Sequence, residues 1–243
     1  MDLHLNLGDG LTGDMFIATV LDAFPQFEQR VIAAIDAMDA PHPVACSLVA
    51  HADAEGSGHR FEIEPFDKYF GDIPFAFSQE RASWESVRER LAAADLKPGV
   101  RTHATRIFEL LAKAESAVWG IASEEMPFDV RGWNSIAQVM GAAALIDALE
   151  PARWTASAFA PGEAVTLTGA AIVDYLCPSS SQRSRAQVPR MRNLVRSGTG
   201  FGSQKSSLRL FCFEEGDEAL AGRDDSAQAP QRAAGRVGEQ PMP

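Results

Sequence analysis

The stretch GDGLTGD, near the start of the sequence, has the residue types and the spacing of a ligand-binding loop. Gly8, Gly10 and Gly13 spell the dinucleotide fingerprint, in which backbone N–H groups and a helix N-terminus face a pyrophosphate. Asp9 and Asp14 bring negative charge into the loop, where they would repel a phosphate unless a divalent cation bridged the groups. The alternative is a structural turn in which Asp14 supplies the negative charge favoured at a helix N-terminus. The two carboxylates favour the turn over a dinucleotide site.

The elements around this loop would place it where α/β proteins bind ligands. Residues 3–7 form a short apolar run that predicts a strand, and Asp14 begins a helical segment. The apolar residues of this segment recur at the spacing of one helix face and include Phe16, Val20, Ala23 and Phe24. A strand, a glycine turn and a helix in succession put the turn at the carboxyl end of the strand, which is the ligand-binding edge of such sheets.

The remaining patterns predict a mixed α/β fold, with several helices packed on a small sheet. Paired strands are expected at 44–52 and 59–64, joined by a turn that contains Gly56 and Gly58. A second glycine cluster precedes a further strand, and the two occupy 198–202 and 207–213. Helices are expected at 27–38, 84–94, 100–118, 135–149 and in the apolar segment that ends before Pro178.

Local capping signals predict where three of these helices begin or end. Gly120 follows the 100–118 helix as a C-cap. Ser135 and Gln138 have the spacing of a capping box, which predicts a helix start at Ser135. Thr168 is the predicted N-cap of the helix before Pro178.

Composition and charge narrow the classes of function. The chain has 243 residues, of which 46% are hydrophobic, and this is enough for a sizeable core. The formal net charge of −11 disfavours nucleic acid and anionic membranes as partners. No apolar run approaches the roughly 18 residues that a membrane span needs. The first residues lack a basic segment followed by a long apolar one, so we expect no secretory signal and a cytoplasmic protein.

Cysteine and histidine usage bears on metal binding. Cys46, Cys177 and Cys212 are far apart and lie in apolar contexts, so we expect reduced and mostly buried thiols. No CxxC pair supports a cysteine-based zinc site. His51 and His59 flank the hairpin turn, where they are either metal ligands or solvated polar residues, and we favour the second interpretation.

The composition changes near residue 214. Residues 1–213 are predicted to form the folded domain and residues 214–243 a disordered polar tail. The tail consists largely of Asp, Glu, Gly, Ala, Gln and Pro, which cannot bury enough apolar area to offset the entropy lost on ordering.

Several segments resemble, in the same order, segments of the LarC nickel-insertion family. The resemblance begins with LNLGDGLTGDMFIATVLD and continues through 105–121, 128–149, 165–172 and 196–210. Members of this family insert nickel into a pyridinium-bisthiocarboxylate mononucleotide, the precursor of the nickel-pincer cofactor of lactate racemase. They also have a C-terminal domain that binds CTP with a divalent metal. The present chain resembles their N-terminal half, which implies a LarC N-terminal-domain-like fold.

The resemblance also implies roles for individual residues. Asp14 and Asp129 would be catalytic, and Asp9 and Asp14 would be the candidates for metal binding. Together these carboxylates could hold Mg²⁺ or a substrate ammonium group, or they could be surface and capping residues. The implied contacts to a small-molecule ligand come from Gly10, Thr12, Gly13, Thr166, Thr168 and Gly169.

The chain departs from the family at positions that could ligate a cation. Aspartates or histidines of the family are replaced here by Asn6, Trp119, Met126, Phe128, Asn134 and Gln138. Nickel sites use imidazole, thiolate or carboxylate donors, and an amide is a weak neutral donor in comparison. The segment that would bind CTP has no counterpart in the sequence.

Three hypotheses follow. The first is a divergent LarC-type protein, a nickel chelatase of the lyase class, that acts on a nucleotide-like substrate. It would depend on a LarC-type C-terminal subunit for CTP and its divalent metal, or act as a homo-oligomer. The second is a catalytically silent paralogue that serves as a binding or scaffold subunit. The third is a small-molecule binder that uses the loop between Gly8 and Asp14 without metal.

Truncation after Glu215 is expected to leave the folded domain intact, because the removed residues have no core pattern. Amide hydrogen exchange on the full chain measures this directly. Residues 222–243 should exchange like an unfolded chain, and protected amides in that range would show that the tail is part of the fold.

Overall fold

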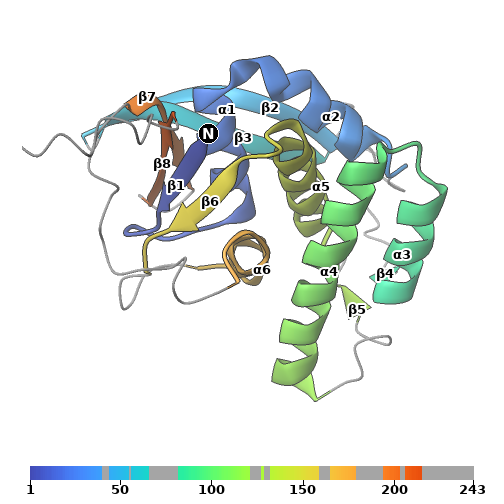
Figure 1. Cartoon of the computed structure of the whole chain (residues 1–243). Helices are drawn as coiled ribbons and strands as arrows, with labels where there is room; N and C mark the ends of the chain where they lie inside the picture. The colour runs from blue at the N-terminus through green and yellow to red at the C-terminus, as the bar shows by residue number, and fades with distance from the viewer. Residues whose placement is uncertain are drawn as a thin grey trace, which may run out of the picture.

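A computed structural model describes residues 1–39, 44–54, 56–65, 82–120, 127–128, 132–158, 165–178, 194–202 and 206–214. The main strands are β1 (Asp2–Asn6), β2 (Val44–Asp53), β3 (Gly56–Pro65), β6 (Arg153–Ala156), β7 (Leu194–Phe201) and β8 (Ser207–Phe213). They form a six-stranded sheet in the order β2-β3-β7-β8-β1-β6 (Figure 1). The pairs β1–β6 and β3–β7 are parallel and the others antiparallel, so the predicted mixed α/β fold is confirmed. Two short strands, β4 (Ala82–Ser83) and β5 (Pro127–Phe128), pair separately.

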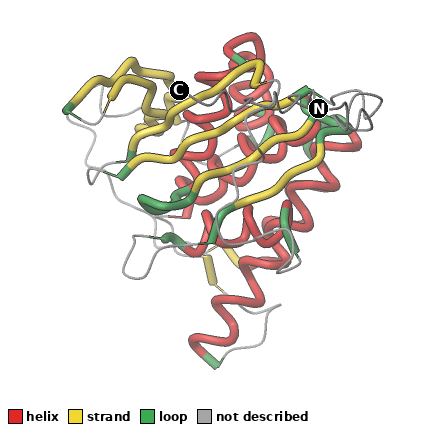
Figure 2. The backbone as a smooth tube through the Cα atoms, turned by 60° about the vertical axis from the view of Figure 1, so that its left-hand side comes forward, coloured by secondary structure: helices red, strands yellow, loops and turns green. Residues whose placement is uncertain are grey.

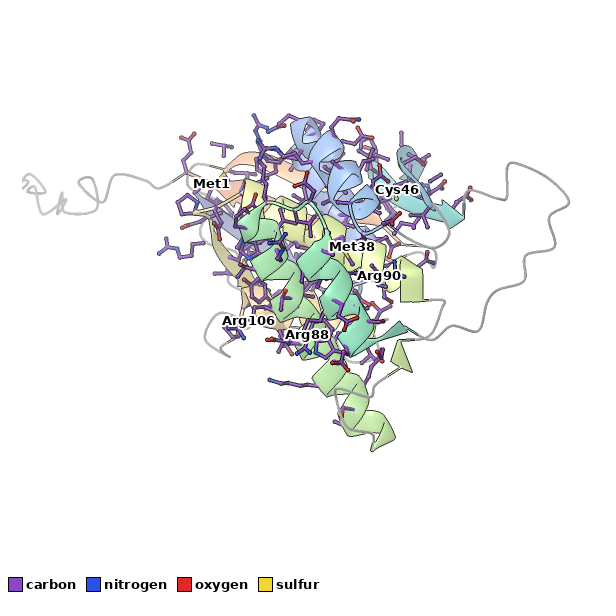
Figure 3. All side chains as sticks on the ribbon, turned by 90° about the vertical axis from the view of Figure 1, so that its right-hand side faces the viewer. Met1, Met38, Cys46, Arg88, Arg90 and Arg106 are labelled. Carbon is purple, nitrogen blue, oxygen red and sulfur yellow. The ribbon has the colours of Figure 1, made fainter. Side chains whose placement is uncertain are left out.

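The helices are gathered behind the strands of the main sheet (Figure 2). They are α1 (Gly13–Ala23), α2 (Glu28–Asp36), α3 (Trp84–Ala93), α4 (Pro98–Trp119), α5 (Gly132–Ala148) and α6 (Leu167–Leu176), with a 3₁₀ turn at Pro25–Phe27. Helix α1 lies on β3, β7 and β8, and α5 packs against α1, α2 and α4. The outermost pair is α3 and α4, whose Arg88 and Arg106 are exposed on the surface (Figure 3). No described helix has both the length and the apolarity needed to cross a membrane.

Glycines of β7 allow α1 to lie directly on the sheet. A Cβ atom added to Gly200 would collide with the carbonyl oxygen of Met15 and with the Thr19 hydroxyl, and one added to Gly198 would collide with the Thr19 carbonyl oxygen. The Thr19 hydroxyl donates within the helix to the Met15 carbonyl at 2.6 Å and also lies 3.3 Å from the carbonyl oxygen of Leu208 on β8. The second glycine cluster of the sequence therefore belongs to a strand that seats a helix.

The core is built on both sides of α1. Leu3 and Leu5 on β1 are fully buried, and Phe16 of α1 meets Trp154 of β6 with ring centroids 5.8 Å apart. Helix α5 crosses on the other side at Gly141, where an added Cβ would lie 2.6 Å from Ile17 Cδ1. Helix α1 is thus fixed between the sheet and α5.

Several predicted elements are confirmed. The hairpin of β2 and β3 pairs from Val44–Pro65 to Asp53–Gly56. The predicted turn at Gly56 and Gly58 is wrong, because both glycines pair within β3, opposite Asp53 and His51. Gly120 ends α4 in the left-handed conformation, with φ of 67°, as expected of a C-cap glycine. The predicted tail, residues 214–243, is outside the described residues except for Glu214, so the domain boundary stays a prediction.

The predicted start of α5 at Ser135 is wrong. The helix begins at Gly132, so Ser135 lies inside it and does not cap it. The additional turn places Asn134 one helical turn before Gln138, on the same face. Both side chains line a cavity beside α1. The Gln138 side chain, which a capping box would direct back to Ser135, donates to Asp14 of α1 instead.

Replacing Gly200 with alanine is expected to lower the free energy of unfolding by about 1–3 kcal/mol, because the new methyl group meets the backbone of α1 rather than a flexible side chain. Urea denaturation measures the change. Ser197→Ala on the same strand is the control, and this exposed position should change stability by less than about 0.5 kcal/mol. Equal effects of the two substitutions would contradict the close contact between α1 and β7.

Candidate functional site

The glycine-rich loop connects β1 to α1 through a tight turn. The Gly10 amide donates to the carbonyl of Leu7 at 3.2 Å, and Gly10 has a φ of 109°, a conformation that L side chains rarely adopt. Thr12 is the N-cap of α1, and its hydroxyl accepts from the Met15 amide at 3.3 Å. Asp14 lies in the first turn of the helix, as the sequence predicted.

A second helix begins beside this loop. Leu11 forms a parallel bridge with Val165, and the Thr166 amide donates to the Leu11 carbonyl at 3.0 Å. The Thr166 hydroxyl then accepts from the Gly169 amide at 3.1 Å, so Thr166 is the N-cap of α6. The predicted cap, Thr168, is wrong: Thr168 is buried inside the first turn, because the bridge to Leu11 fixes the helix start two residues earlier.

The structure therefore brings together the residues that the sequence assigned to ligand binding. Gly10, Thr12 and Gly13 come from the start of α1, and Thr166, Thr168 and Gly169 come from the start of α6. Gly169 lies so close to Leu11 that an added Cβ would be 2.6 Å from the Leu11 carbonyl oxygen. Two of the polar groups in this set, the Thr12 and Thr166 hydroxyls, already cap their own helices.

Asp14 pairs with α5. Its Oδ1 accepts a hydrogen bond from Gln138 Nε2 at 3.2 Å. Gly13 makes room for this contact, since a Cβ there would lie 2.6 Å from Gln138 Oε1. Because the Gln138 amide is neutral, it leaves the negative charge of Asp14 in place and only fixes the position of the carboxylate.

A cavity of about 320 Å³ opens next to this pair, between the start of α1, the start of α5 and the second half of β3. We name it the α1–β3 cavity. Its lining residues are Asp14, Arg60, Phe61, Glu62, Ile63, Glu64, Asn134, Gln138, Phe201 and Gly202. The lining combines carboxylates, two amides and a single guanidinium group, so it offers partners for both signs of charge.

Arg60 stands out among these residues. Its Nε atom is buried and has no hydrogen-bond partner among the described residues. Its Nη2 atom lies 3.4 Å from Nε2 of His51 on the neighbouring strand. An unpaired buried donor on a charged group is costly, which makes this atom a candidate for contact with a ligand.

Sequence reasoning missed the contribution of β3 to the site. Arg60, Glu62 and Glu64 alternate with the apolar Phe61 and Ile63 along the strand. This period of two was visible in the sequence and would have placed the three charged residues on one face. The position of this part of β3 beside the starts of α1 and α5 required the sheet order, which local patterns do not contain.

Other candidate residues lie apart from the cavity. Asp9 is exposed, and its Oδ2 accepts from the Ser207 hydroxyl of β8 at 3.1 Å. Asn6 Oδ1 accepts from the Gly8 amide at 3.2 Å and so closes the turn after β1. Asp129 and Met126 are outside the described residues. Within the described ranges, no group of three or more His, Cys, Asp and Glu side chains is arranged to hold a metal ion.

The hairpin histidines each contact a carboxylate. His59 Nδ1 lies 2.5 Å from Asp22 Oδ1, and the other oxygen of Asp22 accepts from the Thr199 amide at 2.8 Å. His51 Nε2 lies 3.3 Å from Asp53 Oδ2. The contacts of Asp22 with His59 and Thr199 join the hairpin to α1 and β7, whereas the contact of His51 with Asp53 lies within β2.

The cysteine thiols are poor nickel ligands at neutral pH. None of the three forms a disulfide bond, and Cys177 and Cys212 are buried, as expected from the sequence. Burial raises the pKa of Cys46 to about 11, with the nearby Asp36 adding to the rise, and burial also raises the pKa of Cys212 to about 11. Cys46 lies on β2 beside the end of α2 (Figure 3). Because the thiolate is the metal-binding form, both groups stay protonated and unreactive near pH 7.

Comparison with known proteins identifies the family. The family model described as nickel insertion protein matches residues 3–164, which include α1, β3 and α5. The chain belongs to the nickel insertion protein family. The match thus covers the described residues of the α1–β3 cavity except Phe201 and Gly202 of the β7 end.

Curated relatives carry the same designation. A pyridinium-3,5-bisthiocarboxylic acid mononucleotide nickel insertion protein of a Nocardioides species is 34% identical over 137 residues, covering 56% of this chain and 32% of the relative. Putative nickel insertion proteins of Geobacter sulfurreducens and Pelobacter propionicus are 30% and 26% identical, covering 60% and 83% of this chain. The chain spans only 35% and 56% of those two relatives. No solved structure matches the chain.

The contact between Asp14 and Gln138 can be tested by a double-mutant cycle. Asp14→Ala is expected to lower the free energy of unfolding by about 0.5–1 kcal/mol, because it removes the negative charge in the first turn of α1. Part of this loss should disappear in a Gln138→Ala background, with a coupling energy of about 0.5–1.5 kcal/mol. Urea denaturation of the two single variants and the double variant gives the coupling, and strictly additive effects would mean that the hydrogen bond is absent.

Proposed function

We propose that this protein acts in nickel insertion and that the α1–β3 cavity is its small-molecule site. One observation carries the proposal: Asp14 lies about 120 residues before Asn134 and Gln138, all three lie within the segment matched by the nickel insertion family, and they line one cavity. The cavity volume of about 320 Å³ is within the range of small-molecule sites. The Nocardioides relative is named for a pyridinium-3,5-bisthiocarboxylic acid mononucleotide, so we propose a substrate of this nucleotide-like class.

The proposed reaction transfers nickel as cargo, and the residues of this chain position the acceptor. The Asp14 carboxylate, held by Gln138, is proposed to contact the incoming cation or the reacting end of the substrate. Asp129 is proposed as a second catalytic carboxylate from the segment that precedes α5. The adjoining starts of α1 and α6 lie outside the cavity lining. They are proposed to contact a part of the substrate that extends beyond the cavity, through Gly10, Thr12, Gly13, Thr166, Thr168 and Gly169, with Asp9 as a further candidate cation ligand.

We also propose a partner for the activity. The chain spans between 32% and 56% of the length of the relatives that it matches. We propose that a LarC-type C-terminal subunit supplies CTP and its divalent metal, or that copies of this chain assemble with each other. Three cysteines without a disulfide bond are compatible with the proposed cytoplasmic location.

A specific observation also favours the second candidate function, a catalytically silent binding or scaffold subunit. The described residues contain no cluster of three metal-ligating side chains, and two positions on the α1–β3 cavity are amides. An amide cannot replace a carboxylate as an anionic donor to nickel. Under this alternative the cavity binds the small molecule and a partner provides the nickel ligands.

Replacing the amides of Asn134 and Gln138 with carboxylates tests whether they limit Ni²⁺ binding. The isolated chain is expected to bind Ni²⁺ weakly and substoichiometrically, because Asp14 is the only carboxylate among the three positions that converge from α1 and α5. The combined substitution Asn134→Asp with Gln138→Asp should tighten Ni²⁺ binding by about tenfold or more, since two anionic donors are added beside Asp14. Titration calorimetry at neutral pH, on protein without a histidine tag, measures both.

The control for this titration is Asn6→Asp, which adds one carboxylate at the turn after β1, outside the cavity lining. It should change Ni²⁺ affinity less than the paired substitution does. A stoichiometric site of micromolar affinity or tighter in the unmodified chain would overturn the silent-subunit alternative. It would direct mutagenesis to His4, His51, His59 and His103. Nickel insertion into the mononucleotide in the presence of a LarC-type C-terminal subunit tests the proposed function itself.

A further inference from the structure

We infer that Arg60 is a specificity residue of the α1–β3 cavity and binds an oxyanion of a ligand that also carries a positive charge. The inference rests on the proposed function, because it places a pyridinium-type nucleotide in this cavity. It goes beyond that function by assigning a recognition role to a residue on β3, for which the sequence suggested no role in ligand binding.

The first support is the unsatisfied guanidinium. Arg60 Nε is buried without a hydrogen-bond partner among the described residues, although it belongs to a group that is charged at all physiological pH values. The contact with His51 uses Nη2 and leaves Nε unpaired. Guanidinium groups bind carboxylates and phosphates through two parallel N–H donors, and the edge that contains Nε is one such pair. Arg60 lines the cavity, so a small rotation of the guanidinium toward an oxyanion bound there would give the buried Nε donor the partner that it lacks.

The second support is the way in which β3 presents this residue. Antiparallel pairing with Val49 on β2 fixes Arg60 in register. On the other side, the recorded pairing between β3 and β7 is at His59 and Gly200, immediately before Arg60. From Arg60 onward the strand borders the cavity instead of β7. Strand pairing thus fixes the backbone of Arg60 at the point where the recorded pairing of β3 with β7 ends and the cavity begins.

The third support is the balance of charge. Asp14, Glu62 and Glu64 place carboxylates around the same cavity, against the single guanidinium of Arg60. A purely anionic ligand would meet repulsion from these carboxylates, and a purely cationic ligand would leave Arg60 unused. A ligand with a cationic ring and an anionic group matches both signs of the lining. Such a ligand can present its oxyanion either as a ring carboxylate or as a ribose phosphate.

Four pyridinium nucleosides and nucleotides separate these two sources. Nicotinic acid mononucleotide carries a ring carboxylate and a phosphate, nicotinamide mononucleotide carries the phosphate alone, nicotinic acid riboside carries the carboxylate alone, and nicotinamide riboside carries neither. Dissociation constants are measured by titration calorimetry for the full chain and for Arg60→Gln and Arg60→Lys. Arg209→Gln is the matched control, because Arg209 is an exposed arginine on β8 outside the cavity lining.

We expect nicotinic acid mononucleotide to bind more tightly than nicotinamide riboside to the unmodified chain. Arg60→Gln should weaken binding of the ligands that carry the recognised oxyanion by about 10- to 100-fold and leave nicotinamide riboside unchanged. Arg60→Lys should recover part of the loss, since it keeps the charge without the fork. A loss that follows the carboxylate assigns Arg60 to the ring end of the ligand, and a loss that follows the phosphate assigns it to the ribose end.

Three results would overturn the inference: no binding of any of the four ligands, equal binding of all four, or an Arg60→Gln effect no larger than that of Arg209→Gln. Thermal unfolding confirms that each variant is folded, and Arg60→Lys carries the test if Arg60→Gln is not. Nickel insertion is assayed separately with a LarC-type C-terminal subunit. If ligand binding depends on Arg60 but no nickel insertion occurs, only the proposed function is contradicted. If nickel insertion occurs and the KM for the mononucleotide is unchanged in Arg60→Gln, only the role of Arg60 is contradicted.

Discussion

The close contact between α1 and the backbone of β7 is the constraint on which the site depends. Gly198 and Gly200 remove the side chains that would otherwise separate the helix from the strand. The helix axis of α1 is therefore held close to the sheet, and the loop before α1 lies at the carboxyl end of β1. The same position brings the first turn of α1 against α5, where Gly13 and Gln138 meet. These close contacts on both sides of α1 fix its position, and Asp14 and the amides of α5 therefore line the same cavity.

The chemistry of the α1–β3 cavity follows from what α5 and β3 contribute. Helix α5 provides amides, which orient the Asp14 carboxylate without supplying further anionic donors. Strand β3 provides carboxylates and a guanidinium at alternate positions. The protonated thiols of Cys46 and Cys212 add no soft ligand for nickel at neutral pH. We propose that this polar site holds an organic ligand that carries both a positive and a negative charge, and that it binds a bare metal ion only weakly.

Much of the fold was predictable because its signals are local. The hairpin of β2 and β3, the length of α4 and its Gly120 C-cap follow from alternation, periodicity and the left-handed conformation of glycine. The two helix starts next to the site were misassigned, at Ser135 and Thr168, because tertiary contacts decided them. The bridge from Leu11 to Val165 sets the start of α6, and the Gln138 side chain bonds to Asp14 of α1 rather than back to Ser135.

The candidate site was predictable only in part, for the same reason. Asp14 and the glycine-rich loop have a sequence signature, and the family match supports their importance. Arg60, Glu62 and Glu64 form a charged strand face without a motif. They come close to Asp14 only because β3 lies beside β7 in the sheet and α1 packs on both strands. Non-local pairing of this kind is not encoded in any short window of the sequence.

The central claim is that the α1–β3 cavity is where this protein binds its small molecule. Backbone amide shifts of ¹⁵N-labelled protein during titration with nicotinic acid mononucleotide test it most directly. The account predicts shifts concentrated at Asp14, at residues 60–64, at Asn134 and Gln138, and at Gly202. Shifts concentrated instead at the separate cavity between α2, α4 and α5, which is lined by Arg30, Lys97 and Asp147, would contradict it. A spectrum that does not change at millimolar ligand would contradict it equally.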